Sequence, residues 1–316
     1  MKCLTSLLVL STAVFASAAD WPARVFAPYM YLGAGDNFKL TECDDACGQK
    51  YYTIAFIIAD KRNEPAWDGR FPLEQNLYSD QISAIRQRGG DVIVSFGGQG
   101  GKELAIVETN LVALESKYQS AIDRYKLTWL DFDIEGEALF KQDANERRNA
   151  VLAKLQARNP GLTISYTLPV DPGGFTRGTK ELLTDAKAKG VSVHSGNFMI
   201  MWFGPKFTTG KKMTDVCITS ALKAHEQCQA IDPAIRIGLT ALIGKNDQIS
   251  GEVFTQDDAK VLKEWADGQP WVGSLSFWAI NRDAGKPAGK RTGNTATGLP
   301  QEPWEFTRIF KPFTTK

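Results

Sequence analysis

The chain has 316 residues, of which 43% are hydrophobic and 23% are charged, and its 37 basic residues nearly balance its 36 acidic ones. This composition is typical of a folded, soluble protein, and the balanced charge gives no electrostatic reason to expect nucleic acid or an anionic membrane as a partner. Because the sequence contains only two histidines, His194 and His225, it also argues against a histidine-rich zinc site.

The first residues have the pattern of a secretory signal peptide. Lys2 precedes an apolar run, Leu4–Phe15, and three small residues at 16–18 follow that run. This pattern predicts cleavage after Ala18. The apolar run is too short to span a bilayer, and no later segment has about 18 consecutive apolar residues. We therefore expect a secreted, extracellular protein whose mature part, residues 19–316, forms one domain.

Eight short stretches rich in aromatic and β-branched residues recur along the mature chain. Several are nearly continuous apolar runs, which is typical of strands buried on both faces of a parallel sheet. We predict strands at Val25–Leu32, Tyr52–Ala59, Asp91–Phe96, Leu127–Glu135, Leu162–Leu168, Asn197–Phe203, Ile235–Ile243 and Ser274–Ile280.

Segments with apolar residues at helical spacing lie between these strands. We predict helices at Leu77–Arg88, Leu104–Tyr125, Glu146–Arg158, Thr214–Ala230, Asp257–Trp265 and, after a polar loop at Arg282–Pro303, Trp304–Phe310. Alternating strands and helices imply parallel pairing, and eight such units can close into a barrel. No linker or change of composition divides the chain. The predicted fold class is therefore α/β, with a single (β/α)8 TIM barrel.

Four cysteines remain after the signal peptide: Cys43, Cys47, Cys217 and Cys228. An even number in an oxidising compartment favours two disulfides, and nearest-neighbour pairing joins Cys43 to Cys47 and Cys217 to Cys228. Four free buried thiols are the alternative. Zinc ligation is a further alternative, which the unequal C-x3-C and C-x10-C spacings disfavour.

One predicted strand, Leu127–Glu135, carries acidic residues at every second position near its end. Because side chains alternate along a strand, Asp131, Asp133 and Glu135 project to one face. Like charges in the low-dielectric interior of a barrel raise the pKa of at least one member. Glu135 is the last of the three, nearest the carboxyl end of the strand, where barrel enzymes place their catalytic groups. The pattern therefore predicts a general acid at Glu135.

A calcium loop or a run of exposed acids would account for these carboxylates less well. The letters D-x-D-x-E-G copy the start of an EF-hand calcium loop, but the twelfth position is Gln142 rather than Glu, and a strand rather than a helix precedes them. Ordinary exposed acids would lie in a solvated run of charges. Phe132 and Ile134, which lie between the carboxylates, argue against such a run.

The acidic series resembles the strand-4 signature of glycoside hydrolase family 18, the chitinase family, which reads D-x-x-D-x-D-x-E. Asp131, Asp133 and Glu135 match its last three acidic positions, and Thr128 stands where the first Asp would be. The resemblance covers the whole mature chain and is greatest to small bacterial-type members without an inserted α+β domain.

Two further motifs carry the same resemblance. The family signature S-x-G-G at the end of strand 3 is matched by Ser95–Gly98, and the tryptophan that floors the sugar site on strand 8 is matched by Trp278. Tyr29 on the first strand and Gln99 after the third are expected to point toward the mouth of the barrel.

The resemblance implies an enzyme that cleaves β-1,4-linked N-acetylglucosamine, as in chitin, with retention and with assistance from the substrate. Glu135 would protonate the glycosidic oxygen. Asp133 would hold the N-acetyl group whose carbonyl oxygen attacks the anomeric carbon, and Asp131 would tune Asp133 from beneath. This chemistry requires no metal or other cofactor. The expected partner is chitin or N-acetylglucosamine oligosaccharides, bound by a monomer.

Strand 6 departs from the family pattern, in which a Met is followed closely by Tyr and by Asp or Asn. Here the segment reads Met199-Ile200-Met201-Trp202-Phe203. Met199, Met201 and Trp202 are expected to line the substrate site, with barrel core as the alternative for the methionines. The departure supports a second hypothesis, a catalytically weak or inactive protein that binds chitin oligosaccharides. A glycoprotein glycan is a third possible ligand, because loops rather than the acids select the polymer.

Overall fold

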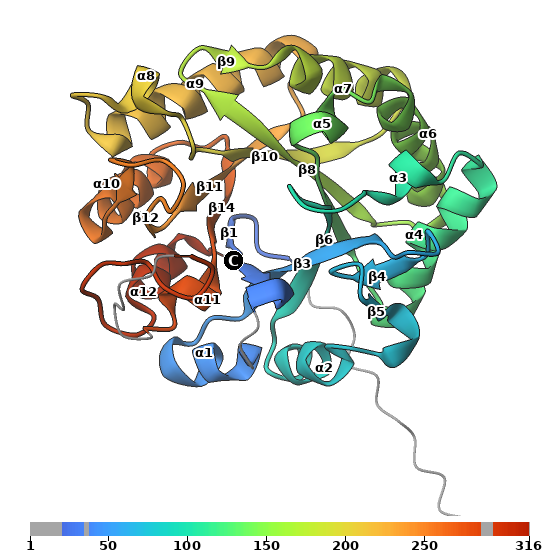
Figure 1. Ribbon diagram of the computed structural model, residues 1–316, viewed down its shortest axis with the longest axis horizontal. Helices are drawn as coiled ribbons and strands as arrows, with labels where there is room; N and C mark the ends of the chain where they lie inside the picture. Colours follow the sequence, from blue (N-terminus) through green and yellow to red (C-terminus); the bar gives the residue numbers. More distant parts are fainter. Residues whose placement is uncertain (1–20, 35–37, 286–292, 316) are drawn as a thin grey trace, which may run out of the picture.

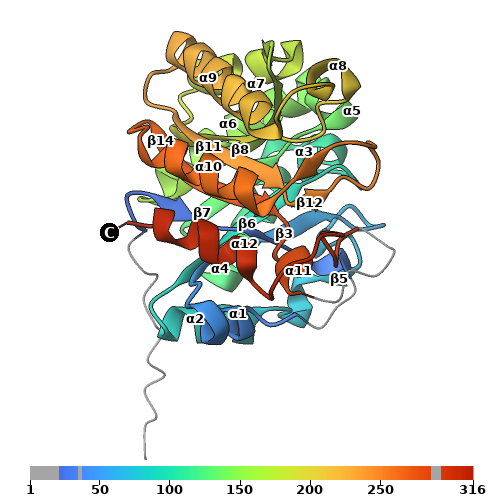
Figure 2. The same cartoon turned by 90° about the vertical axis from the view of Figure 1, so that its left-hand side faces the viewer.

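The computed structural model describes residues 21–34, 38–285 and 293–315. The segment predicted to be a signal peptide, residues 1–18, lies outside these ranges. Figure 1 shows a central ring of strands surrounded by helices, as predicted for a (β/α)8 barrel. Figure 2, turned by 90°, shows α5 (Gly136–Leu139), α8 (Pro205–Thr208) and β12 (Gly244–Lys245) at one end of this barrel.

Twelve of the described strands form one large sheet that closes on itself, and β12 and β13 (Val253–Phe254) form a separate two-stranded sheet. Its hydrogen-bonded order is β1-β14-β11-β10-β8-β7-β6-β3, and β2 pairs with β3. The barrel closes because β1 and β2 follow each other along the first strand of the ring: Val25 pairs with Ser274 of β14, and Tyr29 pairs with Thr53 of β3. The strands are β1 (Val25–Phe26), β2 (Tyr29–Tyr31), β3 (Tyr51–Ala59), β4 (Pro65–Trp67), β5 (Phe71–Pro72), β6 (Asp91–Gly97), β7 (Trp129–Asp133), β8 (Thr163–Asp171), β9 (Gly174–Phe175), β10 (Val193–Met199), β11 (Arg236–Leu242), β12, β13 (Val253–Phe254) and β14 (Val272–Trp278).

Helices cover the outside of the barrel. The described helices are α1 (Leu40–Cys47), α2 (Ser79–Gln87), α3 (Leu104–Val107), α4 (Leu111–Tyr125), α5, α6 (Gln142–Arg158), α7 (Arg177–Ala188), α8, α9 (Met213–Ile231), α10 (Gln256–Asp267), α11 (Ile280–Asp283) and α12 (Glu305–Phe310), with 3-10 turns at Leu32–Ala34, Leu73–Gln75 and Lys311–Phe313.

Several boundaries differ from the sequence prediction. The helix predicted over Leu104–Tyr125 is two helices, because the Asn110 side chain accepts hydrogen bonds from the backbone N–H groups of Val112 and Ala113 and begins a new helix there. Helices α1 and α7 were not predicted. The strand predicted over Asn197–Phe203 is Val193–Met199, so the chain has already left the sheet at Trp202.

Side-chain alternation on β7 separates the barrel interior from the helix layer. Phe132 points outward, where its ring centroid lies 5.3 Å from that of Phe96 on the neighbouring strand β6 and 5.3 Å from that of Tyr118 on α4. Asp131 and Asp133 therefore point inward, and both are buried. The inward placement of two carboxylates on one strand is the feature of the fold that creates the site.

The disulfide prediction is wrong for Cys217 and Cys228, and the structure forms no bond between Cys43 and Cys47. All four are free thiols. Cys217 and Cys228 lie eleven positions apart on α9, which places them roughly 16 Å apart along the helix axis, a distance that no disulfide can bridge. The sulfurs of Cys43 and Cys47, one turn apart on α1, are 3.4 Å apart, and the Cys47 thiol donates to the Cys43 carbonyl at 3.0 Å. The spacing in the sequence suggested a pair at Cys217 and Cys228 that the rise of α9 rules out.

The described part of the chain holds neither a metal cluster nor a membrane-spanning helix. It contains no group of three or more His, Cys, Asp or Glu side chains arranged to hold a metal ion. Within the same ranges, no helix has both the length and the apolar character needed to cross a membrane.

Candidate active site

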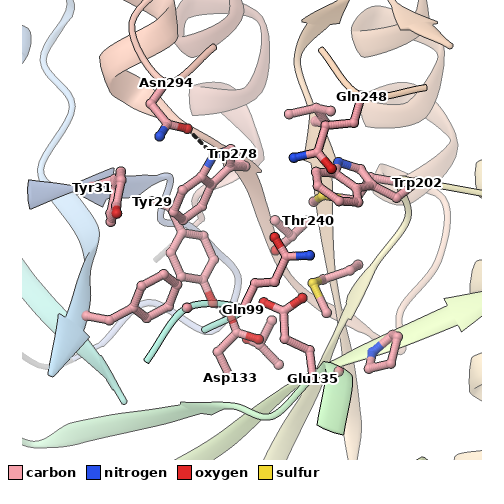
Figure 3. Close-up of a pocket in the computed structure, with 18 of the residues that line it drawn as sticks. Tyr29, Tyr31, Gln99, Asp133, Glu135, Trp202, Thr240, Gln248, Trp278 and Asn294 are labelled. Atoms are coloured by element: carbon pink, nitrogen blue, oxygen red, sulfur yellow. Dashed lines mark hydrogen bonds between the residues drawn. The ribbon is translucent and has the colours of Figure 1, made fainter. Parts of the chain in front are cut away.

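A cavity of about 800 Å³ opens at the carboxyl ends of the barrel strands. Figure 3 shows Asp133, Glu135 and Gln99 at its base and Trp278 above them. The structure brings nearly all of the predicted site residues into its lining, namely Tyr29, Gln99, Asp133, Glu135, Met199, Met201, Trp202 and Trp278. Asp131 lies beneath this lining. Trp202 forms part of the wall, so the cavity is open between Asp133, Glu135 and Trp278.

The Ser95–Gly98 motif allows β6 and β7 to approach closely at the base of the cavity. The Ser95 hydroxyl donates to Asp131 at 2.7 Å, and the Gly98 N–H donates to the Asp133 carbonyl at 2.9 Å. A Cβ atom on Gly97 would lie 2.2 Å from that carbonyl, and Gly97 has a φ of 101°, which favours glycine. The two glycines therefore position the end of β7 and its carboxylates.

Asp131 is held by hydroxyl groups on every side. Ser95 and Ser165 donate to its carboxylate at 2.7 Å, and Tyr29 and Thr167 donate at 3.0 Å. Burial raises the pKa of Asp131, and these four hydrogen bonds oppose that increase. A carboxylate with this many donors is fixed in place, which suits a positioning role rather than proton transfer.

Asp133 has the opposite environment although it is only two residues away. It is 5% exposed, and its Oδ1 atom has no hydrogen-bond partner among the described residues. Burial raises the pKa of Asp133 well above its usual range, and the nearby charges of Glu135 and Asp131 raise it further. A buried oxygen without a partner is costly, and a ligand donor entering the cavity would satisfy it.

Glu135 lies at the start of α5, directly after β7. Burial raises its pKa to about 7, and a hydrogen bond from the backbone N–H of Gln99 opposes the increase. A carboxylic acid with a pKa near neutrality can hold a proton and release it within one reaction. The site thus places a carboxyl group with a pKa near neutrality next to a buried carboxyl group whose Oδ1 atom has no donor among the described residues.

Aromatic rings form one wall of the cavity around Trp278. Its ring stacks on Phe56 with centroids 5.7 Å apart and planes 13° apart, and Tyr29 and Tyr31 lie 5.7 and 5.1 Å away. The Trp278 indole N–H donates to the Asn294 side chain at 3.2 Å, as drawn in Figure 3. The indole is therefore held in a fixed orientation, as a platform for a flat apolar surface requires.

A chain of hydrogen bonds across the barrel interior was missed by sequence reasoning. The Thr240 hydroxyl, in the cavity lining, donates to the Asn197 side chain at 2.9 Å, and Asn197 donates to Thr167 at 2.9 Å. Thr167 in turn donates to Asp131. Thr240, Asn197 and Thr167 come from the neighbouring strands β11, β10 and β8, and no local sequence pattern marks them, because only the barrel register brings them together.

Loop residues Asp247, Gln248 and Asn294 also line the cavity and were not predicted. They come from segments after β12 and α11 that show no hydrophobic periodicity. Their sequence contains no signal that would have identified them.

No family model matches the chain. Among curated proteins, a probable bifunctional chitinase/lysozyme from Escherichia coli is 32% identical, over 93% of this chain and 35% of its own length. Endochitinase 11 from Metarhizium anisopliae is 31% identical, over 83% of this chain and 53% of its own length. The chain thus spans about a third and about half of the length of these two relatives.

Solved structures provide a relative of matching length. The catalytic domain of a hyperthermophilic chitinase from Pyrococcus furiosus is 32% identical with a TM-score of 0.81, and the alignment covers 94% of this chain and 96% of that domain. Catalytic-site mutants of the same chitinase have been solved with chito-oligosaccharides, at a TM-score of 0.83. Identity at this level over nearly the whole of both chains shows that the protein belongs to glycoside hydrolase family 18, the chitinases.

Proposed function

We propose that the protein hydrolyses β-1,4-linked N-acetylglucosamine polymers or oligomers, as in chitin, with retention of configuration and with assistance from the substrate. One observation carries this proposal: Glu135, with a pKa of about 7, borders an open cavity beside the buried, unpaired oxygen of Asp133. The chito-oligosaccharides bound by the Pyrococcus chitinase mutants support the choice of substrate.

In the first step Glu135 transfers its proton to the glycosidic oxygen as the bond to the anomeric carbon breaks. The carbonyl oxygen of the substrate's own N-acetyl group attacks that carbon and forms a cyclic oxazolinium ion. Asp133 accepts a hydrogen bond from the acetamido N–H, which gives its unpaired oxygen a partner and holds the acetyl group for attack. Two inversions, the first by the acetyl group, explain why configuration would be retained.

In the second step water opens the oxazolinium ion. Glu135, now ionised, accepts a proton from that water as its oxygen bonds to the anomeric carbon, and the acid returns to its starting form. No side chain of the protein forms a covalent bond to the sugar, so the usual separation rule for two catalytic carboxylates does not apply. Asp131 contributes by keeping the end of β7 fixed.

A binding protein without hydrolysis is the second candidate. It is favoured by Trp202, which stands in the cavity wall where the family pattern has a polar group that would contact the reacting acetyl group. Loss of such a donor costs about a hundredfold in rate. One comparison of binding and turnover separates the two candidate functions.

The test compares wild-type protein with Glu135→Gln on soluble N-acetylglucosamine oligomers. We expect Glu135→Gln to lower kcat by about 10²–10⁴, the range for loss of a general acid, while the binding constant changes little. Glu137→Gln, an exposed residue on the same short helix, is the matched control and should retain activity. Tight binding without turnover by wild type would establish the second candidate instead.

We also propose that the protein is exported, on the pattern of its first 18 residues. Mass spectrometry of the chain from the culture medium should find a chain that begins at Ala19. Recovery of uncleaved chain from the cytoplasm alone would contradict export.

A further inference from the structure

Trp202 and Gln248 form the side of the cavity that faces Trp278 and Asn294, as Figure 3 shows. Trp202 comes from the segment after β10, and Gln248 comes from the loop between β12 and β13. Neither residue contributes to the reaction steps described above. Both present polar or aromatic surface to the same open space.

A buried carboxylate joins these two segments. Glu252 is 3% exposed, and its Oε1 atom accepts the Gly204 N–H at 2.5 Å, two residues after Trp202. Its Oε2 atom accepts the Asn246 side-chain amide at 3.0 Å. The Asn246 side-chain oxygen accepts the N–H of Gln248 at 3.0 Å and that of Ile249 at 3.1 Å. We call Glu252 and Asn246 the latch.

The latch acts on a segment with a strained backbone. Trp202 has a φ of 59°, in the left-handed region that bulky residues rarely adopt. Such conformations persist only where neighbouring contacts fix them, and they concentrate at functional positions. The bond from Gly204 to Glu252 is a contact of this kind, because it fixes the chain directly after the strained residue.

We propose that Trp202 and Gln248 bind a second N-acetylglucosamine unit of the substrate, next to the unit on Trp278, and that Glu252 is the positioning residue that holds them in place. The indole face would pack on the apolar face of the sugar ring, and the Gln248 amide would hydrogen-bond its hydroxyl or acetamido groups. This inference deepens the proposed function and rests on it.

The polarity of the latch provides a specific test. In Glu252→Gln, the amide oxygen can still accept from Gly204, but the NH₂ group then faces the NH₂ group of Asn246, and two donors cannot pair. In Asn246→Asp, two carboxylates face each other and repel. The double variant combines Glu252→Gln with Asn246→Asp. In it, the amide at position 252 donates to the carboxylate at position 246, and that carboxylate still accepts from the backbone N–H of Gln248. The pairing is restored with its polarity reversed.

We expect each single latch variant to raise KM for long chito-oligosaccharides about fivefold to tenfold, the effect of about one lost hydrogen bond, with kcat almost unchanged. Short oligomers that reach only Trp278 should be affected less. The double variant should restore the wild-type KM. Trp202→Ala, which leaves the latch intact, should raise KM in the same length-dependent way. Glu264→Gln, an exposed residue on α10, is the control for loss of one negative charge and should behave as wild type.

A merely structural latch would give a different result. Thermal stability would fall in the single variants while KM stayed constant for every oligomer length, and that outcome would overturn the inference. Binding measured by tryptophan fluorescence in the Glu135→Gln background gives the same comparison without turnover. Wild-type protein that neither binds nor cleaves the oligomers would refute the proposed function itself, whereas normal hydrolysis with unaltered latch variants would refute only this inference.

Discussion

Asp131 and Asp133 are two residues apart on one strand and point to the same side, yet their surroundings are opposite. Four hydroxyl groups from three different strands donate to Asp131, whereas one oxygen of Asp133 has no partner among the described residues. The first carboxylate lies in the closed interior of the barrel and the second lines its open end. The difference shows how one strand can supply both the support of a site and its reactive end.

The physical reason is position along the barrel axis. Inside the ring, neighbouring strands surround a side chain and can supply donors from several directions, as Ser95, Ser165 and Thr167 do for Asp131. Near the mouth the strands end, and loops supply fewer partners. A group there remains buried but unsatisfied, and substrate can take the place of the missing donor.

The sharpest test of this difference is Asp133→Ala. We expect kcat to fall by about 10²–10³, because a group that orients the acetamide for attack is lost. The free energy of unfolding at neutral pH should stay the same or rise, because the variant removes a buried carboxyl without a partner. Kinetics and chemical denaturation measure the two effects. A large loss of stability would show that Asp133 is held by partners as Asp131 is.

Asp131→Ala should lower the free energy of unfolding, in contrast to Asp133→Ala. It leaves four buried hydroxyls without their acceptor, and we expect a loss of about 3 kcal/mol in the free energy of unfolding. Asp131→Asn retains one acceptor oxygen and should lose less. Denaturant titration of both variants checks whether Asp131→Ala is the less stable of the two. If Asp131→Ala were as stable as wild type, the four hydrogen bonds would not be the support inferred here.

The smallest predicted effect is the pH dependence of the wild-type rate. In the proposed mechanism Glu135 carries a proton at the start of the reaction, and burial raises its pKa to about 7. The value of kcat/KM should therefore fall about tenfold per pH unit as the pH rises above about 7. The same group lowers the free energy of unfolding as the pH rises from about 4.5, the ordinary pKa of a glutamate, to about 7, because over this range the unfolded state loses a proton that the folded state still binds. A rate independent of pH well above 7 would exclude Glu135 as the acid.

Local patterns in the sequence were enough to predict the barrel, the series of acids and the position of Trp278. These depend on patterns that are local: apolar runs of strand length, acids at every second position and short motifs next to strand ends. The same local reasoning was wrong for Cys217 and Cys228, because both lie on α9, whose rise over eleven positions, roughly 16 Å, is too long for a disulfide. It also extended the sixth strand as far as Phe203, although the strand ends at Met199.

The hydrogen-bond partners of each carboxylate depend on how strands that are distant in sequence pack together. The donors to Asp131 and the chain from Thr167 through Asn197 to Thr240 come from different strands, and barrel closure sets their register. Glu252 likewise contacts Gly204 from a loop 48 residues further along the chain. A hydrogen bond forms only where donor and acceptor lie about 3 Å apart, to within a few tenths of an ångström, and packing brings groups remote in sequence to such distances. The chain therefore specifies the residues of the site, and packing gives each of them its environment.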